Sequence, residues 1–290
     1  KERHIPIESL EDLASLMRTM KENAINGVSL DDLQKAYKYA INKVEASKAE
    51  GIGLKGYYDE DFPESLRKTV DEDGKVNPPL LLWYRGDFSI TKLPGIAVIG
   101  TREPTKEGTI GGKYLACEFS KRGFNIVSGL ATGCDTCGHQ GALDANGKTT
   151  AILANGLDGK SIYPPENREL AENIVNRGGL LLSEYPINTS VNRYSLVARD
   201  RLQSGLAQAT LVIQTGKVGG TMHAAKATME ANKPLYVMLF KNEETNKQEK
   251  CLGNEILHEQ GAIYIKGNDN IDDICNNIRN RKVIKTDLFD

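Results

Sequence analysis

The 290-residue chain has few cysteines, almost no surplus of charge of either sign and no long apolar run. Its five cysteines are too few and odd in number for a disulfide-stabilised secreted domain, and they fit a reduced, cytoplasmic protein. No apolar run reaches the roughly 20 residues that a membrane-spanning helix needs, so we expect no membrane partner. A formal net charge of −2 excludes a global polycation. Any binding of nucleic acid must therefore use a local basic patch.

The sequence pattern divides the chain into three parts. Residues 1–50 predict a small helical domain, because Leu10, Leu13 and Leu16 recur at helical spacing and Ser29 can cap a second helix. Residues 51–94 are rich in glycine, proline and charge, and we interpret them as a linker and entry segment. Residues 95–290 predict the main domain.

In the main domain, short apolar runs alternate with helix-like segments, which predicts an α/β fold. We expect an extended Rossmann-like, mostly parallel sheet with helices on both faces. The expected strands are 96–99, 124–128, 149–154, 180–182, 210–214, 235–240 and 262–265. The expected helices are 106–121, 134–146, 166–177, 193–208, 220–231, 253–260 and 270–280.

The residues directly after these runs are candidates for ligand binding, because ligands of such sheets lie beyond the carboxyl ends of the strands. Three runs end in turns that combine glycine with a hydroxyl residue, a pattern typical of phosphate binding. Arg102 adds a planar charged group that suits phosphate oxygens. The candidates in these turns are Gly100, Thr101, Arg102, Ser128, Gly129, Lys217, Gly219, Gly220 and Thr221.

Several motifs in order resemble the DNA-processing protein A (DprA/Smf) family. They are Pro78 to Gly86, Ala97 to Arg102, Ile126 to Ala131, His139 to Leu143, Leu181 to Pro186, and Arg199-Asp200-Arg201 through Leu206. The resemblance covers about residues 51–265. It implies a Rossmann-like domain, related to the LOG-type nucleotide-binding fold, that binds single-stranded DNA without a cofactor and without turnover chemistry. It also implies a recombinase as a possible partner and a possible homodimer.

The resemblance assigns roles to individual side chains. Arg102 would hold a backbone phosphate, with Gly100, Ser128 and Gly129 donating hydrogen bonds. Arg193 and Tyr194 would offer a cation and a ring for stacking on a base. Arg199 and Arg201 stand where the family has its Arg-Asn-Arg stretch.

Two departures from the family keep other ligands open. Asp200 replaces the asparagine between the two arginines, and a free carboxylate there would repel DNA. On that basis, Asp200→Asn is expected to raise affinity for a single strand several-fold. The turn from Lys217 to Thr221 also resembles the phosphate loop of LOG-type phosphoribohydrolases, although Met222 and His223 stand where those enzymes have glutamates. A sensor of a nucleotide-derived ligand and a nucleotide N-glycosidic hydrolase therefore remain alternatives.

The remaining candidates for chemistry have simpler explanations. Cys134 and Cys137, with His139 nearby, lack the further ligands that zinc needs, so we expect packing and no metal. Asp135 and His139 lie one helical turn apart, which favours a structural pair. We expect Glu184 to orient a loop, and no residue stands out as a catalytic nucleophile.

Overall fold

The computed structural model describes residues 9–19, 27–71 and 74–281, and the chain divides into two compact units after Gly51. The first unit contains α1 (Leu10–Arg18) and α3 (Leu30–Ala49). Ser9 and Ser29 cap these helices, and each serine forms a reciprocal capping box with an aspartate three residues later. The predicted helical character of this part is confirmed for its described residues.

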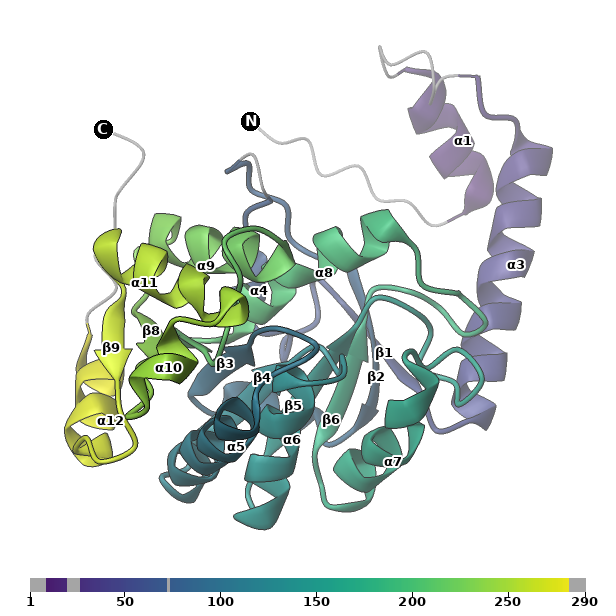
Figure 1. The fold of residues 1–290 in the computed structure, drawn as a ribbon. Coiled ribbons are helices and arrows are strands. Elements are labelled where there is room, and N and C mark those ends of the chain that lie inside the picture. The colour runs from purple at the N-terminus through teal and green to yellow at the C-terminus, as the bar shows by residue number, and fades with distance from the viewer. Residues whose placement is uncertain (1–8, 20–26, 72–73, 282–290) are drawn as a thin grey trace. The chain divides into compact units, whose positions relative to one another are not determined.

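The second unit contains one nine-stranded sheet with the order β1-β2-β6-β5-β4-β3-β7-β8-β9 (Figure 1). Every pairing among β3 to β9 is parallel, whereas β2 pairs antiparallel with both β1 and β6. The strands are β1 (Gly53–Gly56), β2 (Leu81–Gly86), β3 (Gly95–Ile99), β4 (Asn125–Ser128), β5 (Thr149–Leu153), β6 (Leu180–Ser183), β7 (Ala209–Val212), β8 (Leu235–Met238) and β9 (Ile263–Ile265). The predicted α/β fold with a mostly parallel sheet is confirmed.

Helices cover both faces of this sheet, so every residue of β3 to β8 is buried. One face carries α5 (Lys106–Lys121), α6 (Cys134–Asp144), α7 (Arg168–Asn176) and α12 (Ile271–Asn280) (Figure 1). The other face carries α4 (Glu64–Arg67), α8 (Arg193–Leu206), α9 (Gly220–Glu230) and α11 (Leu252–Glu259). The remaining connections contain α10 (Glu243–Asn246), η1 (Phe88–Lys92), η2 (Pro165–Asn167) and η3 (Glu249–Cys251).

The segment that we interpreted as a linker and entry segment contributes to this sheet. Its residues form β1, α4, β2 and η1, and β2 joins the parallel strands through β6. Phe62, Leu66, Leu82 and Phe88 from this segment are buried in a cluster with residues of β6 and α8. Residues 52–94 therefore belong to the same compact unit as the rest of the sheet, within the described ranges.

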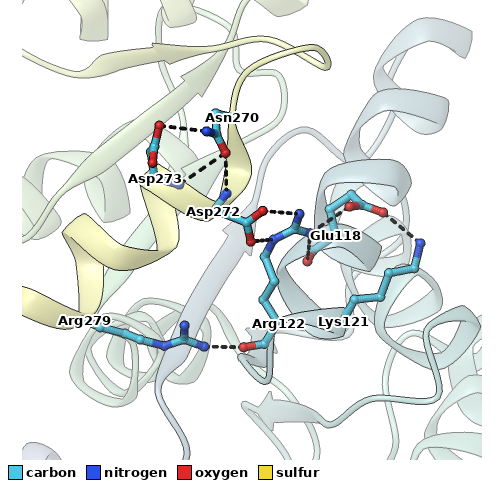
Figure 2. A network of polar contacts seen from close by, with 7 residues as sticks. All are labelled: Glu118, Lys121, Arg122, Asn270, Asp272, Asp273 and Arg279. Carbon is cyan, nitrogen blue, oxygen red and sulfur yellow. Dashed lines mark hydrogen bonds and ion pairs between the residues drawn. The ribbon is translucent and has the colours of Figure 1, made fainter.

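Helix α12 is attached to the end of α5 by a network of charged side chains (Figure 2). The Arg122 guanidinium donates to Asp272 at 2.6 Å and to Glu118 at 2.7 Å, and Glu118 also accepts from Lys121 at 2.8 Å. The hydrogen bond from Arg122 lowers the pKa of Asp272 below its usual value. Arg279 donates in turn to the carbonyl of Arg122. These bonds connect the last described helix with the first helix that follows β3.

In the described part of the chain, no helix combines the length and the apolar character needed to cross a bilayer.

Candidate functional site

Strands β3 and β7 mark the point where the chain reverses its direction across the sheet. They are neighbours in parallel register, from Ile96 opposite Ala209 to Ile99 opposite Val212. The connection after β3 passes through α5 to β4, whereas the connection after β7 passes through α9 on the opposite face to β8. The two connections therefore separate at the carboxyl ends of β3 and β7, where such sheets bind ligands. We call the region between loops 100–105 and 213–219 the switch-point crevice.

The loop after β3 brings Arg102 to this crevice. A β-carbon added to Gly100 would lie 2.5 Å from the Cys134 sulfur and 2.8 Å from the Gln214 carbonyl oxygen, so only glycine fits. The Thr101 amide donates to the same Gln214 carbonyl at 2.7 Å. The Arg102 side chain is exposed and forms no hydrogen bond or ion pair with another described residue. Its guanidinium is therefore available to an anion.

Gln214 joins the two loops of the crevice, and the sequence analysis missed it. Its side-chain oxygen accepts from the Thr105 amide at 2.8 Å, and its side-chain nitrogen donates to the Thr105 hydroxyl at 3.0 Å and to the Cys251 sulfur at 2.9 Å. Thr105 caps α5 by accepting from the Gly108 amide. The sequence feature that could have indicated this role is the position of Gln214 at the end of an apolar run. A fully buried side-chain amide at such a place needs specific hydrogen-bond partners.

We expect Gln214→Leu to destabilise the fold by about 1–3 kcal/mol, because it leaves the part-buried Thr105 amide without its acceptor and removes one of the two donors to the Thr105 hydroxyl. Chemical denaturation of the variant measures this loss. The control is Gln260→Leu at the exposed end of α11, which we expect to change stability by less than about 0.5 kcal/mol. Equal stability of the two variants would contradict the assigned role of Gln214.

The loop after β7 leads into the amino end of α9 at the other side of the crevice. Helix α9 begins at Gly220, and no side chain caps it. Gly219 has a φ of 128°, which favours glycine, and Lys217 is exposed. Thr221 follows in the first turn. The first amides of α9 thus lie at the carboxyl edge, with partial positive charge and without an internal acceptor.

Ser128 and Gly129, at the end of β4, are engaged inside the protein. The Ser128 hydroxyl donates to the Val98 carbonyl at 2.6 Å, and the Gly129 amide donates to Asp135 at 3.0 Å. Both residues are buried. The two groups that the sequence offered as phosphate donors therefore already have acceptors.

The buried Arg199 side chain links α8 to the carboxyl ends of β4 and β5. Its guanidinium donates to the carbonyls of Gly129 at 2.9 Å and Ile152 at 2.6 Å, and it pairs with Asp200 at 3.1 Å. The side chain is only 10% exposed. In Asp200, burial raises the pKa of the carboxyl and the pairing with Arg199 opposes that rise.

Arg201, on the same helix, forms a second set of contacts that link α8 to other parts of the protein. Its two terminal nitrogens donate to the two oxygens of Glu184, each at 2.6 Å, and its Nε donates to the Asn77 carbonyl at 2.9 Å. Such a bidentate pair has a fixed geometry. Arg201 thus joins α8 to two other segments. It contacts the end of β6 through Glu184, and it contacts the chain before β2 through the Asn77 carbonyl.

Arg193 and Tyr194 are presented at the amino end of α8. Asn192 caps this helix and forms a reciprocal capping box with Ser195. Tyr194 is 85% exposed, and Arg193 is exposed without a hydrogen bond or ion pair to another described residue. Because α8 follows β6, both side chains lie at the same carboxyl edge as the crevice.

The buried ionisable groups below this edge have structural partners. Asp135 accepts from the amides of Gly129 and Ala131, and His139 pairs with the Thr149 hydroxyl at 2.7 Å. Burial lowers the pKa of His139 to about 3, so this ring is neutral at physiological pH. Among the described residues, His, Cys, Asp and Glu side chains form no group of three that could hold a metal ion.

Comparison with known proteins identifies the family of the chain. The family model of DNA recombination-mediator protein A matches residues 54–279. The chain belongs to this family. The matched range includes β1 and β2 as well as the whole parallel sheet, so the family unit begins inside the segment that we interpreted as a linker.

Relatives of this recombination-mediator family share both sequence and structure with the chain. Protein Smf of Synechocystis is 35% identical over 214 residues, which are 72% of this chain and 51% of that protein. The chain thus spans about half the length of this relative. The X-ray structure of DprA from Streptococcus pneumoniae has a TM-score of 0.71 at 26% identity and covers 90% of this chain and 86% of that one. A Helicobacter pylori DprA structure, described for its single-stranded DNA binding mode, has a TM-score of 0.64 at 28% identity, with 78% and 95% covered.

The structure changes the outcome that we expect for Asp200→Asn. The sequence-based expectation of a several-fold gain in affinity rested on a carboxylate free to repel a phosphate. Asp200 is instead paired with Nε of Arg199, whose Nη1 donates to two carbonyls. We now expect the variant to bind single-stranded DNA within about twofold of wild type, which a fluorescence anisotropy titration checks. A several-fold gain would restore the first expectation.

Proposed function

We propose that the protein binds single-stranded DNA along the carboxyl edge of its sheet and acts as a recombination mediator. The observation that carries this proposal is a row of exposed side chains without internal partners. Arg102 and Lys217 flank the switch-point crevice, and Arg193 and Tyr194 lie at the amino end of α8. Cations neutralise backbone phosphates, and an exposed ring stacks on bases of any sequence.

The spread of these groups favours a polymer over a mononucleotide. Arg102 follows β3 and Arg193 follows β6, and two strands lie between them in the sheet. With neighbouring strands about 4.8 Å apart, β3 and β6 are separated by roughly 14 Å. Side chains on segments that leave the sheet at two separate strands suit successive phosphates of a single strand better than one small ligand.

The two alternative functions have less support from the site. The small-ligand sensor was favoured mainly by the extra negative charge of Asp200, and that charge is paired with Arg199. A hydrolase would need a free acid or base, whereas both oxygens of Glu184 accept from Arg201. Release of base from AMP over many turnovers would argue for the hydrolase.

The family description supports the further parts of the proposal. A recombination mediator acts together with a recombinase, so we include a recombinase as the partner and the cytoplasm as the location. A homodimer is proposed as the assembly and is tested by light scattering.

A titration in one buffer tests the binding proposal. Fluorescently labelled oligo(dT), a duplex of the same length and labelled AMP are each titrated with the protein at several salt concentrations. We expect oligo(dT) to bind most tightly and its affinity to fall as salt rises, because bound phosphates release counterions. Absence of salt-dependent binding to oligo(dT), or tighter binding of AMP, would overturn the proposal.

A further inference from the structure

A large groove lies at the amino edge of the sheet, opposite the switch-point crevice. It has a volume of about 1290 Å³. Its walls come from loop 60–65, the end of η1, the end of α8, the loop before β8 and the end of α12. Because β3, β7 and β8 all begin beside it, this groove is a different surface from the carboxyl edge. We call it the amino-edge groove.

The groove is lined by more cations than acids. The cationic side chains are Lys55, Lys92, Lys233, Arg279 and Arg281. Lys92 and Arg281 are exposed and have no hydrogen bond or ion pair with another described residue. These two cationic side chains are therefore available to hydrogen-bond acceptors of a ligand.

Most other polar groups of the groove are already satisfied. Of its three acids, Asp61 pairs with Lys55 at 2.7 Å and Glu64 pairs with Lys68 at 3.1 Å. Lys233 donates to the carbonyls of Ser204, Gly205 and Ala207 at the end of α8, the last at 2.8 Å. Among the described lining residues, a ligand consequently meets two unpaired cations, Lys92 and Arg281, and one unpaired carboxylate, Glu60.

The rest of the lining is apolar. Phe62, Pro63, Leu206, Pro234 and Ile278 contribute to the walls. The volume exceeds the roughly 300–1,000 Å³ of sites for small molecules. A chain segment that carries both carboxylates and apolar side chains would match this combination of size, charge and surface.

We propose that the amino-edge groove binds an acidic, partly apolar peptide segment of a partner protein. We choose an acidic peptide because its carboxylates would complement the charges of Lys92 and Arg281. Its apolar side chains would pack against the apolar wall of the groove. A nucleic acid fits less well, because Phe62, the one aromatic ring among the described lining residues, is only 4% exposed and cannot offer a stacking face. This inference does not depend on DNA binding at the other edge.

The test uses a fluorescent peptide of about ten residues in which glutamate alternates with leucine and phenylalanine. Its binding to the full chain is measured by anisotropy at low salt, beside the same peptide with lysine in place of glutamate. We expect the acidic peptide to bind and the basic one not to bind. The double variant Lys92→Glu/Arg281→Glu should weaken acidic-peptide binding at least tenfold.

A control variant separates local from global charge effects. Arg177→Glu/Lys38→Glu makes the same change in net charge at exposed residues outside the groove. We expect it to retain peptide binding within about twofold, and both double variants to retain binding of oligo(dT). No binding of the acidic peptide, or an equal loss in the two double variants, would overturn the proposal. A loss of oligo(dT) binding confined to the groove variant would also overturn it, and would assign the groove to nucleic acid.

Discussion

Replacing Arg102 by alanine is expected to weaken the binding of single-stranded DNA by roughly 10- to 100-fold. A hydrogen bond between a guanidinium and a phosphate contributes about 1.5–3 kcal/mol, and the exposed Arg102 has no internal partner that would compete for it. The loss should be similar for every sequence, because a phosphate contact does not distinguish bases. The slope of log affinity against log salt should also fall by about 0.7, the share of one phosphate on a single strand. Anisotropy titrations with oligo(dT) and a mixed sequence at several salt concentrations measure both effects.

The matched control for Arg102→Ala is Arg177→Ala. Arg177 is exposed directly after α7, near the start of β6, and therefore lies at the opposite edge of the sheet. Its loss changes net charge by the same amount, and we expect less than a twofold effect on DNA binding. If the two variants bind DNA equally well, Arg102 is not a phosphate ligand, and the crevice loses its assigned role.

Replacing Arg199 by methionine is expected to destabilise the fold by about 3–5 kcal/mol. The substitution removes the cation that lies beside the part-buried Asp200 and the buried Asp135, so both carboxyls lose its stabilisation. It also removes the side-chain donor to the carbonyls of Gly129 and Ile152. Urea denaturation measures the loss. Arg193→Met, an exposed change on the same helix, should cost less than about 0.5 kcal/mol.

The pH dependence of the Arg199→Met effect gives a second check. Burial already raises the pKa values of Asp135 and Asp200, and Arg199 counteracts that rise in both. Without Arg199 the charged carboxylates become more costly, and protonation relieves that cost. The destabilisation should therefore be smaller at pH 5 than at pH 8. A loss of unfolding free energy below about 1 kcal/mol, or a loss that grows as the pH falls, would contradict the structural role assigned to Arg199.

The alternation of apolar runs and helical segments was enough to predict the sheet from β3 to β9 and the helices between its strands. The predicted helix 106–121 has the same bounds as α5, which Thr105 caps by accepting from the Gly108 amide. Strands β1 and β2 were not predicted. They are four and six residues long and stand among glycines, prolines and charges, so no period in the sequence marks them. In the sheet, β2 pairs with β6, a strand about 100 residues away, and β1 pairs with β2.

The sequence places the candidate residues after the strands, but it does not distinguish the arginines by what they contact. Arg102 is exposed, whereas Arg199 and Arg201 have carbonyl and carboxylate partners inside the protein. The chemistry of a guanidinium is the same towards a phosphate, a carboxylate or a carbonyl. Only tertiary contacts decide which acceptor it meets, so local sequence could not separate these residues.

Helix α8 connects the two edges of the sheet. Its first residues, Arg193 and Tyr194, stand at the carboxyl edge, and its last turn ends at the carbonyls that Lys233 holds in the amino-edge groove. With 14 residues it is a stiff rod roughly 21 Å long. A ligand that shifts this rod along its axis at one end also displaces the residues at the other. Any such coupling is reciprocal. If a peptide in the groove changes the affinity for DNA by a certain factor, bound DNA changes the affinity for the peptide by the same factor.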